Sequence, residues 1–207
     1  MSPEAVAAER VYQGLKRVIL EGQFAPGTML VVTTLAREFG TSIAPVRDSM
    51  QRLVGERLLD LHIGGGFQMP RLTADGLAHL YLWHQDLIKL ALKFRRSGTS
   101  SSDYQPAFSL INDDDTHALA EATAELFVHI AGFSGNPEHV EAVRSVGERL
   151  HATRIRETGL SNRLRELERI WALAGSGPSR DAQEAIRRYH RRRLRQVSRL
   201  VPSEEQS

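Results

Sequence analysis

The 207-residue sequence contains no cysteine, which excludes disulfide bonds, thiolate metal ligands and a cysteine nucleophile. It also lacks a run of about 18 uncharged apolar residues, so no segment is expected to span a membrane. Five charged side chains within the first twenty residues exclude a secretory signal. Together these absences favour a protein of the reducing cytoplasm.

Motifs typical of catalysis are missing as well. The sequence has no G-x-S-x-G, no H-E-x-x-H and no phosphate-binding glycine loop before a helix, so we do not expect an enzyme. Excess charge of either sign is also small: the net charge is +2, and residues 1–72 carry eight Lys/Arg against seven Asp/Glu. A nucleic-acid partner would therefore depend on where a few cations point rather than on their number.

The first 72 residues predict three helices followed by a small hairpin. The expected helices cover residues 5–21, 32–39 and about 42–57, and the hairpin is centred on Gly64-Gly65-Gly66. Thr41 or Ser42 suits the N-cap of the third helix, and Pro45 suits its first turn. Two helices joined by a short turn around Gly40 form a helix-turn-helix, and the hairpin behind them forms a wing.

From residue 73 onward the pattern is helical only. Helices are expected over residues 73–96, 115–132, 137–157, 160–174 and 180–201, with a polar loop over 97–115. Trp83 and Trp171 lie among apolar residues and are expected in the core. The predicted fold is mainly α: a winged helix-turn-helix domain (1–72), an all-helical bundle for effector binding and dimerisation (73–201), and a tail (202–207).

The motif order in the first domain resembles the GntR superfamily of bacterial regulators. The resemblance is carried by Pro26-Gly27-Thr28, Leu35-Ala36, the run from Ser42 to Leu53 that includes Pro45-Val46-Arg47, and Gly66-Phe67. The helical remainder is similar to the FCD (FadR-like) type of effector domain, with its best local match at 133–137. This resemblance implies a homodimer that binds a palindromic double-stranded DNA operator and responds to a small carboxylate metabolite.

The resemblance also assigns the DNA-facing residues to the recognition helix and the wing. Ser42, Ala44, Pro45 and Arg47 match the recognition motif, and Gly66 matches the wing. The full predicted DNA-binding set is Thr33, Thr34, Thr41, Ser42, Ile43, Ala44, Pro45, Arg47, Arg52, His62, Gly64, Gly65 and Gly66.

Elementary physical chemistry supports the recognition helix independently of the family. A helix N-terminus offers free N–H groups and the positive end of its dipole to phosphate, and Arg47 lies one turn further along. The alternative for Arg47 is an ion pair with Asp48 or Glu38. A wing of glycines lets the backbone approach a minor groove closely, although the same glycines also suit a simple tight turn.

Three positions depart from the family pattern. Ile43 stands where arginine is usual, Thr33 or Thr34 stands where the family usually has another basic residue, and Gly65 replaces a common arginine or lysine. Each missing donor removes about 1–3 kcal/mol of base discrimination. Either the operator differs, with Ile43 touching a thymine methyl, or binding is weaker; we favour a different operator.

The divalent metal site typical of the FCD group is expected to be lost, so no cofactor is predicted. The family aspartate falls on Thr123 and its first histidine on Phe127, neither of which replaces a carboxylate or an imidazole ligand. The second family histidine falls near 169–170. The third falls near Arg192, with His190 two positions away.

His84 and His190 lie on the apolar stripes of the first and last helices of the bundle. They are either hydrogen-bonded core residues, part of a ligand pocket, or part of a rebuilt metal site. The predicted effector-binding set is His84, Thr123, Phe127, His190 and Arg192. The remaining histidines are expected at the surface.

The last helix also carries an arginine cluster, which is a solvated face, an anion site for the effector, or a contact to DNA or to the acidic stretch 113–115. The cluster comprises Arg187, Arg188, Arg191, Arg192, Arg193, Arg195 and Arg199.

These observations predict a sequence-specific DNA-binding transcriptional regulator whose operator binding is modulated by a small-molecule ligand. The alternative is a non-catalytic binding or structural protein of the same fold with lost or relaxed DNA specificity, which the residues at positions 33 and 43 allow.

Overall fold

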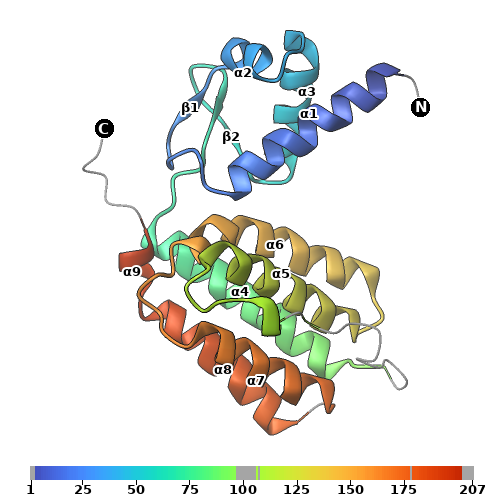
Figure 1. Ribbon diagram of the computed structural model, residues 1–207, viewed down its shortest axis with the longest axis vertical. Helices are drawn as coiled ribbons and strands as arrows, with labels where there is room; N and C mark the ends of the chain where they lie inside the picture. The colour runs from blue at the N-terminus through green and yellow to red at the C-terminus, as the bar shows by residue number, and fades with distance from the viewer. Residues whose placement is uncertain (1–2, 97–105, 107, 178, 202–207) are drawn as a thin grey trace. The chain divides into compact units, whose positions relative to one another are not determined.

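The computed structural model describes residues 3–96, 106, 108–177 and 179–201 (Figure 1). The predicted tail at 202–207 and part of the predicted polar loop, residues 97–105 and 107, lie outside the described residues. The chain divides into two compact units, Met1–Leu72 and Thr73–Ser207.

The first unit combines three helices with a small sheet. Its elements are α1 (Pro3–Leu20), β1 (Met29–Leu30), α2 (Val32–Glu38), α3 (Ile43–Gly55), β2 (Asp60–Leu61) and β3 (Phe67–Gln68). The strands form an antiparallel sheet in the order β1-β3-β2, with Leu30 and Leu61 both paired to Phe67. The sequence pattern did not predict β1, because two residues are too few to show an alternation of period two.

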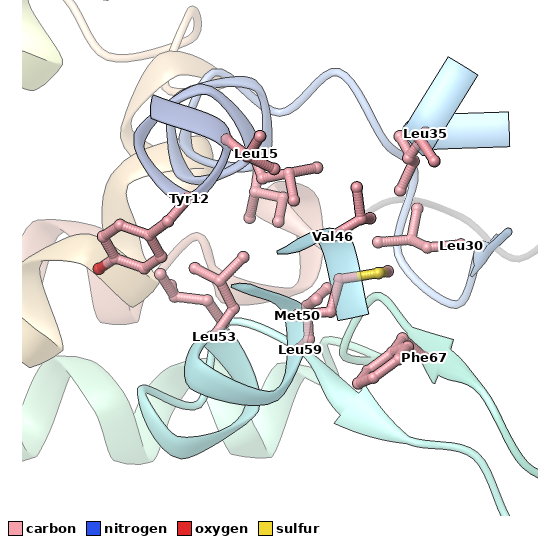
Figure 2. Packing of buried hydrophobic residues seen from close by; sticks show 13 residues of the cluster. Tyr12, Leu15, Leu30, Leu35, Val46, Met50, Leu53, Leu59 and Phe67 are labelled. Atoms are coloured by element: carbon pink, nitrogen blue, oxygen red, sulfur yellow. The ribbon is translucent and has the colours of Figure 1, made fainter. Parts of the chain in front are cut away.

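One apolar cluster holds this unit together. Figure 2 shows Leu15 of α1 packed toward Val46, Met50 and Leu53 of α3, all of them fully buried. Leu35, Leu59 and Phe67 extend the cluster to α2 and the sheet. Because the inner face of α3 is fixed by this core, its opposite face is held outward.

The second unit is a helical bundle. Its elements are α4 (Ala74–Lys93), a 3-10 turn η1 (Phe108–Leu110), α5 (Thr116–Gly132), α6 (Pro137–Ile155), α7 (Arg163–Gly175), α8 (Arg180–Leu194) and α9 (Val197–Leu200). Helix α4 packs against α5, α6 and α8, so it is the central helix of the bundle (Figure 1). None of the helices in the described part of the chain is long and apolar enough to cross a membrane.

Three expectations for this unit are corrected. The helix predicted over 180–201 is broken: the N–H of Gln196 donates to the carbonyl of Arg193 at 2.8 Å, a tight turn that starts α9 and lets Leu200 be buried. Trp83 is 51% exposed rather than in the core, because it lies off the buried stripe that holds Tyr81 and His84. Of the histidines expected at the surface, those at 129, 139 and 151 are half-buried.

Candidate nucleic-acid interface and buried polar network

The amino end of α3 is exposed and its first turn is not capped by its own N-cap side chain. Ser42 occupies the N-cap position in an extended conformation, and its hydroxyl makes no capping hydrogen bond. Ile43 is 46% exposed and Ala44 is also exposed, whereas Val46 is buried in the core. The helix therefore presents its positive dipole end and its first-turn N–H groups to the outside, which is an anion-binding arrangement.

Arg47 lies one turn into α3 on this exposed face. Neither of the expected alternative partners, Asp48 and Glu38, forms an ion pair with it, and no hydrogen bond to its guanidinium occurs among the described residues. A free guanidinium beside a helix N-terminus has donors available for phosphate oxygens or for a guanine edge. Arg47 is therefore the cation of this face best placed to contact a nucleic acid.

The turn between β2 and β3 projects as a small glycine-rich wing. Gly65 and Gly66 both have φ of +90°, a region that favours glycine, so the turn depends on them. The N–H of Gly64 donates to Nδ1 of His62 at 3.1 Å, which leaves Nε2 of the neutral ring as the outward donor. Ile63 at the tip is a fully exposed apolar residue that the sequence pattern did not single out.

The other predicted DNA-facing residues differ in how exposed they are and in the contacts that they make. Thr33 is exposed in the first turn of α2, Thr34 and Thr41 are half-buried, and Pro45 lies in the first turn of α3. Arg52 instead packs against α1. Its guanidinium lies 3.5 Å from the centre of the Tyr12 ring and forms ion pairs with Glu9 at 3.1 Å and Glu56 at 3.4 Å. Most of the donor capacity of Arg52 is used within the domain.

In the helical unit, three buried side chains form one hydrogen-bonded chain. Nδ1 of His190 lies 2.8 Å from the carbonyl oxygen of Ile186, so Nδ1 carries the proton and Nε2 accepts. His84 then donates from Nδ1 to Nε2 of His190 at 2.8 Å, and Nε2 of His84 accepts from Nη2 of Arg154 at 3.3 Å. The bonding pattern requires both imidazoles to be neutral.

The surroundings keep these histidines neutral. Burial lowers the pKa of His190 to about 3, helped by the nearby charges of Arg193 and Arg154 and opposed by its backbone hydrogen bond. Burial likewise holds the pKa of His84 well below its ordinary value, with the charge of Arg154 as the next cause. In the structure the two histidines are buried and hydrogen-bonded to each other.

A fully buried carboxylate, Glu157, lies at the centre of a second cluster. It accepts two hydrogen bonds from Arg193, at 3.1 and 3.0 Å, and one from the hydroxyl of Tyr81 at 2.8 Å. Nε of Arg163 lies 3.3 Å from the same carboxylate. Burial, followed by the charge of Glu157, raises the pKa of Tyr81, so its hydroxyl remains a donor.

Buried positive charge exceeds buried negative charge in this interior. Arg154, Arg163 and Arg193 are all at most 3% exposed, and their carboxylate partners are Glu157 and the half-buried Glu166. Among the described residues, no carboxylate lies within ion-pair distance of Arg154, whose only acceptors are His84 and the carbonyl of Gly147. The sequence pattern did not single out Arg154 and Arg163, and it placed Arg193 only within the cluster of the last helix, because arginine is almost never fully buried unless it is paired.

Several buried polar atoms in this region also lack a partner within the described chain. They are Nε of Arg154, Nη1 of Arg163 and the hydroxyl of Tyr189. Native interiors rarely leave such atoms unsatisfied without a bound water or ion. The excess guanidinium charge makes an anion the group that would satisfy them best.

The predicted effector-binding residues are brought together except for one. Phe127 packs edge-on against His84, with ring centres 4.7 Å apart, and lies 5.9 Å from His190. Thr123 is buried one turn earlier on α5, where its hydroxyl donates to the carbonyl of Leu119 at 2.6 Å. Arg192 points elsewhere and donates to the carbonyl of Ser161 at 2.7 Å near the surface.

The donor set at this place does not fit the divalent metal of the FCD type. Thr123 and Phe127 occupy two of the expected ligand positions, and a guanidinium donates to Nε2 of His84. A neighbouring cation both repels a metal ion and uses the lone pair that would bind it. No group of three or more histidine, aspartate or glutamate side chains that could hold a metal ion occurs among the described residues.

Comparison with known proteins agrees with the architecture of the first unit. Residues 7–69 match the family model of the bacterial regulatory proteins, gntR family. Over 82 residues the chain is 35% identical to the uncharacterized HTH-type transcriptional regulator YdhC of Bacillus subtilis (strain 168). That alignment spans 40% of this chain and only 37% of YdhC.

Solved structures extend the likeness to both units at the level of fold. A protein assigned as a GntR transcriptional regulator from Rhodococcus sp. RHA1 superposes with a TM-score of 0.76 at 19% identity, covering 92% of this chain and 97% of that one. E. coli McbR/YncC gives a TM-score of 0.67 at 16% identity, with 96% and 99% covered. Lar of Listeria monocytogenes, which controls the expression of the agr system, gives 0.58 at 19% identity, with 93% and 97% covered.

The three-helix core, the exposed α3 end and the glycine wing define a winged helix-turn-helix protein. Residues 7–69 of this winged helix-turn-helix match the gntR family model, and a helical C-terminal domain follows it, as in the solved structures of similar fold.

Proposed function

We propose that this protein is a sequence-specific DNA-binding transcriptional regulator that acts as a homodimer. The observation that carries the proposal is the exposed amino end of α3, where Ser42 and Arg47 lie on the face opposite the buried stripe. In helix-turn-helix proteins this helix enters the major groove and reads bases with its N-terminal residues. The wing would contact the neighbouring backbone through the glycines at 64–66 and the outward nitrogen of His62.

Two copies are needed for useful affinity. One small reader domain buries little surface on DNA, whereas a dimer binds two half-sites about one helical turn apart and multiplies the specificity. We therefore expect a palindromic operator. We propose that the helical unit, Thr73–Ser207, makes the contacts between the two copies.

The operator should differ from that of relatives with arginine at the position of Ile43. The side chain of Ile43 is 46% exposed at the first turn of α3, where it can contact a thymine methyl but cannot donate to guanine. We expect a thymine at the base pair that this residue faces.

The test of DNA reading is selection of bound fragments from sheared genomic DNA by the purified full chain. A shared palindrome is expected, and Arg47→Ala should weaken binding to it by about tenfold or more. Arg10→Ala, which removes the same charge from an exposed position on α1, is the matched control and should change affinity far less. Enrichment without a common sequence would contradict the proposal.

We further propose that the helical unit binds a small carboxylate beside Arg154. The support is the buried guanidinium without a carboxylate partner and the unsatisfied Nε of Arg154 and hydroxyl of Tyr189. Phe127, Thr123 and the His84–His190 pair would form the remaining walls, and a carboxylate would neutralise the excess charge directly, without a metal.

A panel of mono-, di- and tricarboxylates tests this part by thermal unfolding of the full chain. A ligand that binds the folded state raises the melting temperature as its concentration rises. Arg154→Met should abolish this rise, because it removes the buried charge that the carboxylate would neutralise, and the melting temperature of the variant without ligand reports whether it is folded. The proposal fails if every carboxylate leaves both proteins unchanged.

A second candidate function follows from the two positions, 33 and 43, that depart from the usual DNA-reading pattern. Ile43 and Thr33 are both exposed on the DNA-facing elements and lack the cationic donors that base reading often employs. A binding or structural protein that retained the fold but relaxed its DNA specificity would show this pattern. It would bind selected and random duplexes equally, and Arg47→Ala would weaken both alike.

A further inference from the structure

A groove of about 840 Å³ lies on the helical unit between α7 and α8 and the turn at Ser161–Asn162. The two helices pack side by side (Figure 1). Six arginines line it from both walls: Arg165 and Arg169 from α7, and Arg188, Arg191, Arg192 and Arg195 from the α8 side.

The carboxylates that also line the groove neutralise only part of this charge. Glu166 is held at 2.7 Å by the buried Arg193 and lies 3.9 Å from Arg192, and Glu184 lies 3.7 Å from Arg191. Within the described part of the chain, the structure shows no ion pair or hydrogen bond for the side chains of the four remaining arginines. These are Arg165, Arg169, Arg188 and Arg195.

The acidic stretch at 113–115 does not neutralise them. Asp113 accepts hydrogen bonds from the N–H groups of Asn162 at 3.1 Å and Leu164 at 2.8 Å, so it caps the start of α7. Asp115 caps α5 by accepting from the N–H of Ala118 at 3.0 Å. The anion-binding capacity of the groove therefore rests on the arginines, because the first-turn N–H groups of α7 are already partly occupied.

Packing does not explain the arginines either. Helix α8 is anchored by Ala182, Ile186 and Tyr189, which are buried, whereas Arg188 and Arg195 are exposed. The guanidinium groups that line this groove repel one another, and a bound multivalent anion would offset that repulsion. Arginine is the residue best suited to this, because its planar fork binds phosphate oxygens in pairs.

We propose that this groove is a binding site for a small ligand that carries two or more phosphate groups. Its volume is within the range of pockets for small metabolites. Arginines from two facing helices close around a compact ligand, whereas a DNA duplex is a convex rod that a flat or protruding basic face suits better. Asp181 and Glu184 in the lining provide acceptors for hydroxyl or amino groups of the same ligand.

This site is separate from the carboxylate site proposed beside Arg154. Arg154 is fully buried, and the groove arginines are half-buried or exposed. The two sites share one link, since Glu166 lines the groove while its carboxylate binds Arg193 of the interior. Either proposal can therefore fail without the other.

The test is calorimetric titration of the full chain with inorganic triphosphate at physiological ionic strength. To remove most DNA binding, the protein carries Arg47→Ala. We expect one triphosphate per chain, and Arg165→Gln/Arg188→Gln should weaken binding by at least about tenfold. The control Arg144→Gln/Lys93→Gln removes the same charge from exposed positions on α6 and α4 and should change affinity by less than about threefold.

Two competitions complete the experiment. Citrate should displace triphosphate weakly if phosphate is the preferred group, and a random DNA duplex should not displace it. Equal weakening by both double variants would mean non-specific charge attraction and would overturn the site. Absence of binding, tighter binding of citrate, or displacement by the duplex would overturn it as well.

Discussion

Replacing Glu157 by glutamine tests the buried network of the helical unit. The substitution keeps the shape of the side chain and an acceptor for the hydroxyl of Tyr81, but removes the charge that faces Arg193 at 3.0 Å and Arg163 at 3.3 Å. Arg163 then remains buried without a carboxylate partner, and Arg193 retains only Glu166 at 2.7 Å. Breaking a buried ion pair in this way costs about 3–5 kcal/mol.

The unfolding of this unit can be followed without interference from the other. Both tryptophans of the chain, Trp83 and Trp171, lie within the unit Thr73–Ser207. Urea titration of the full chain, read by tryptophan fluorescence, should show the midpoint of Glu157→Gln shifted to lower denaturant. The melting temperature should fall by on the order of 10 °C.

An exposed carboxylate provides the matched control. Glu184 is 52% exposed and its ion pairs are at 3.5 and 3.7 Å, so Glu184→Gln should cost less than about 1 kcal/mol. If Glu157→Gln destabilised the unit no more than Glu184→Gln, the idea that buried carboxylate charge holds this interior together would be refuted.

Three further outcomes are expected. The pKa of His190 is lowered from 6.5 to about 3, so its contribution to stability is complete above pH 6.5 and is lost as pH falls toward 3. The free energy of unfolding of His190→Gln should therefore fall less between pH 6.5 and 5 than that of the unchanged protein. An equal fall in both proteins would contradict this sign. Gly65 has a φ of +90°, so Gly65→Ala should weaken operator binding and lower the free energy of unfolding of the domain by about 1 kcal/mol. Gly55→Ala within α3 should not destabilise the domain. Equal effects of the two substitutions would argue against strain in the wing. Met50→Ala should cost about 2–5 kcal/mol in the first unit, measured by hydrogen exchange, because Met50 is fully buried; a loss below about 1 kcal/mol would mean that the core is loosely packed.

Helical periodicity predicted most of the fold because the buried stripes are long. Leu77, Tyr81, His84 and Ile88 repeat at helical spacing along α4, and all four are buried. Short or redirected segments escaped prediction, because β1 has only two residues and the break at Gln196 depends on a local backbone turn. Such features are decided by tertiary packing rather than by a repeating pattern.

The buried charges were the main part of the candidate site that sequence reasoning missed. Leu150, Arg154 and Glu157 lie three or four residues apart, so the apolar stripe of α6 continues directly into two charged residues. The position of these two charged residues on the line of the apolar stripe could have indicated that they are buried. Arginine and glutamate are nevertheless expected at the surface unless a partner is known. The partners, Arg163 and Arg193, come from other helices and only the fold brings them together.

The absence of cysteine allows the DNA contact of α3 to be mapped directly. Ala44→Cys, carrying an iron chelate that cleaves nearby DNA, should cut the selected operator at two places about one helical turn apart, one in each half-site. Glu141→Cys, at an exposed position on α6, should give no cleavage at those places. Equal cleavage by both variants, or none by Ala44→Cys on DNA that the protein demonstrably binds, would show that the amino end of α3 does not enter the groove.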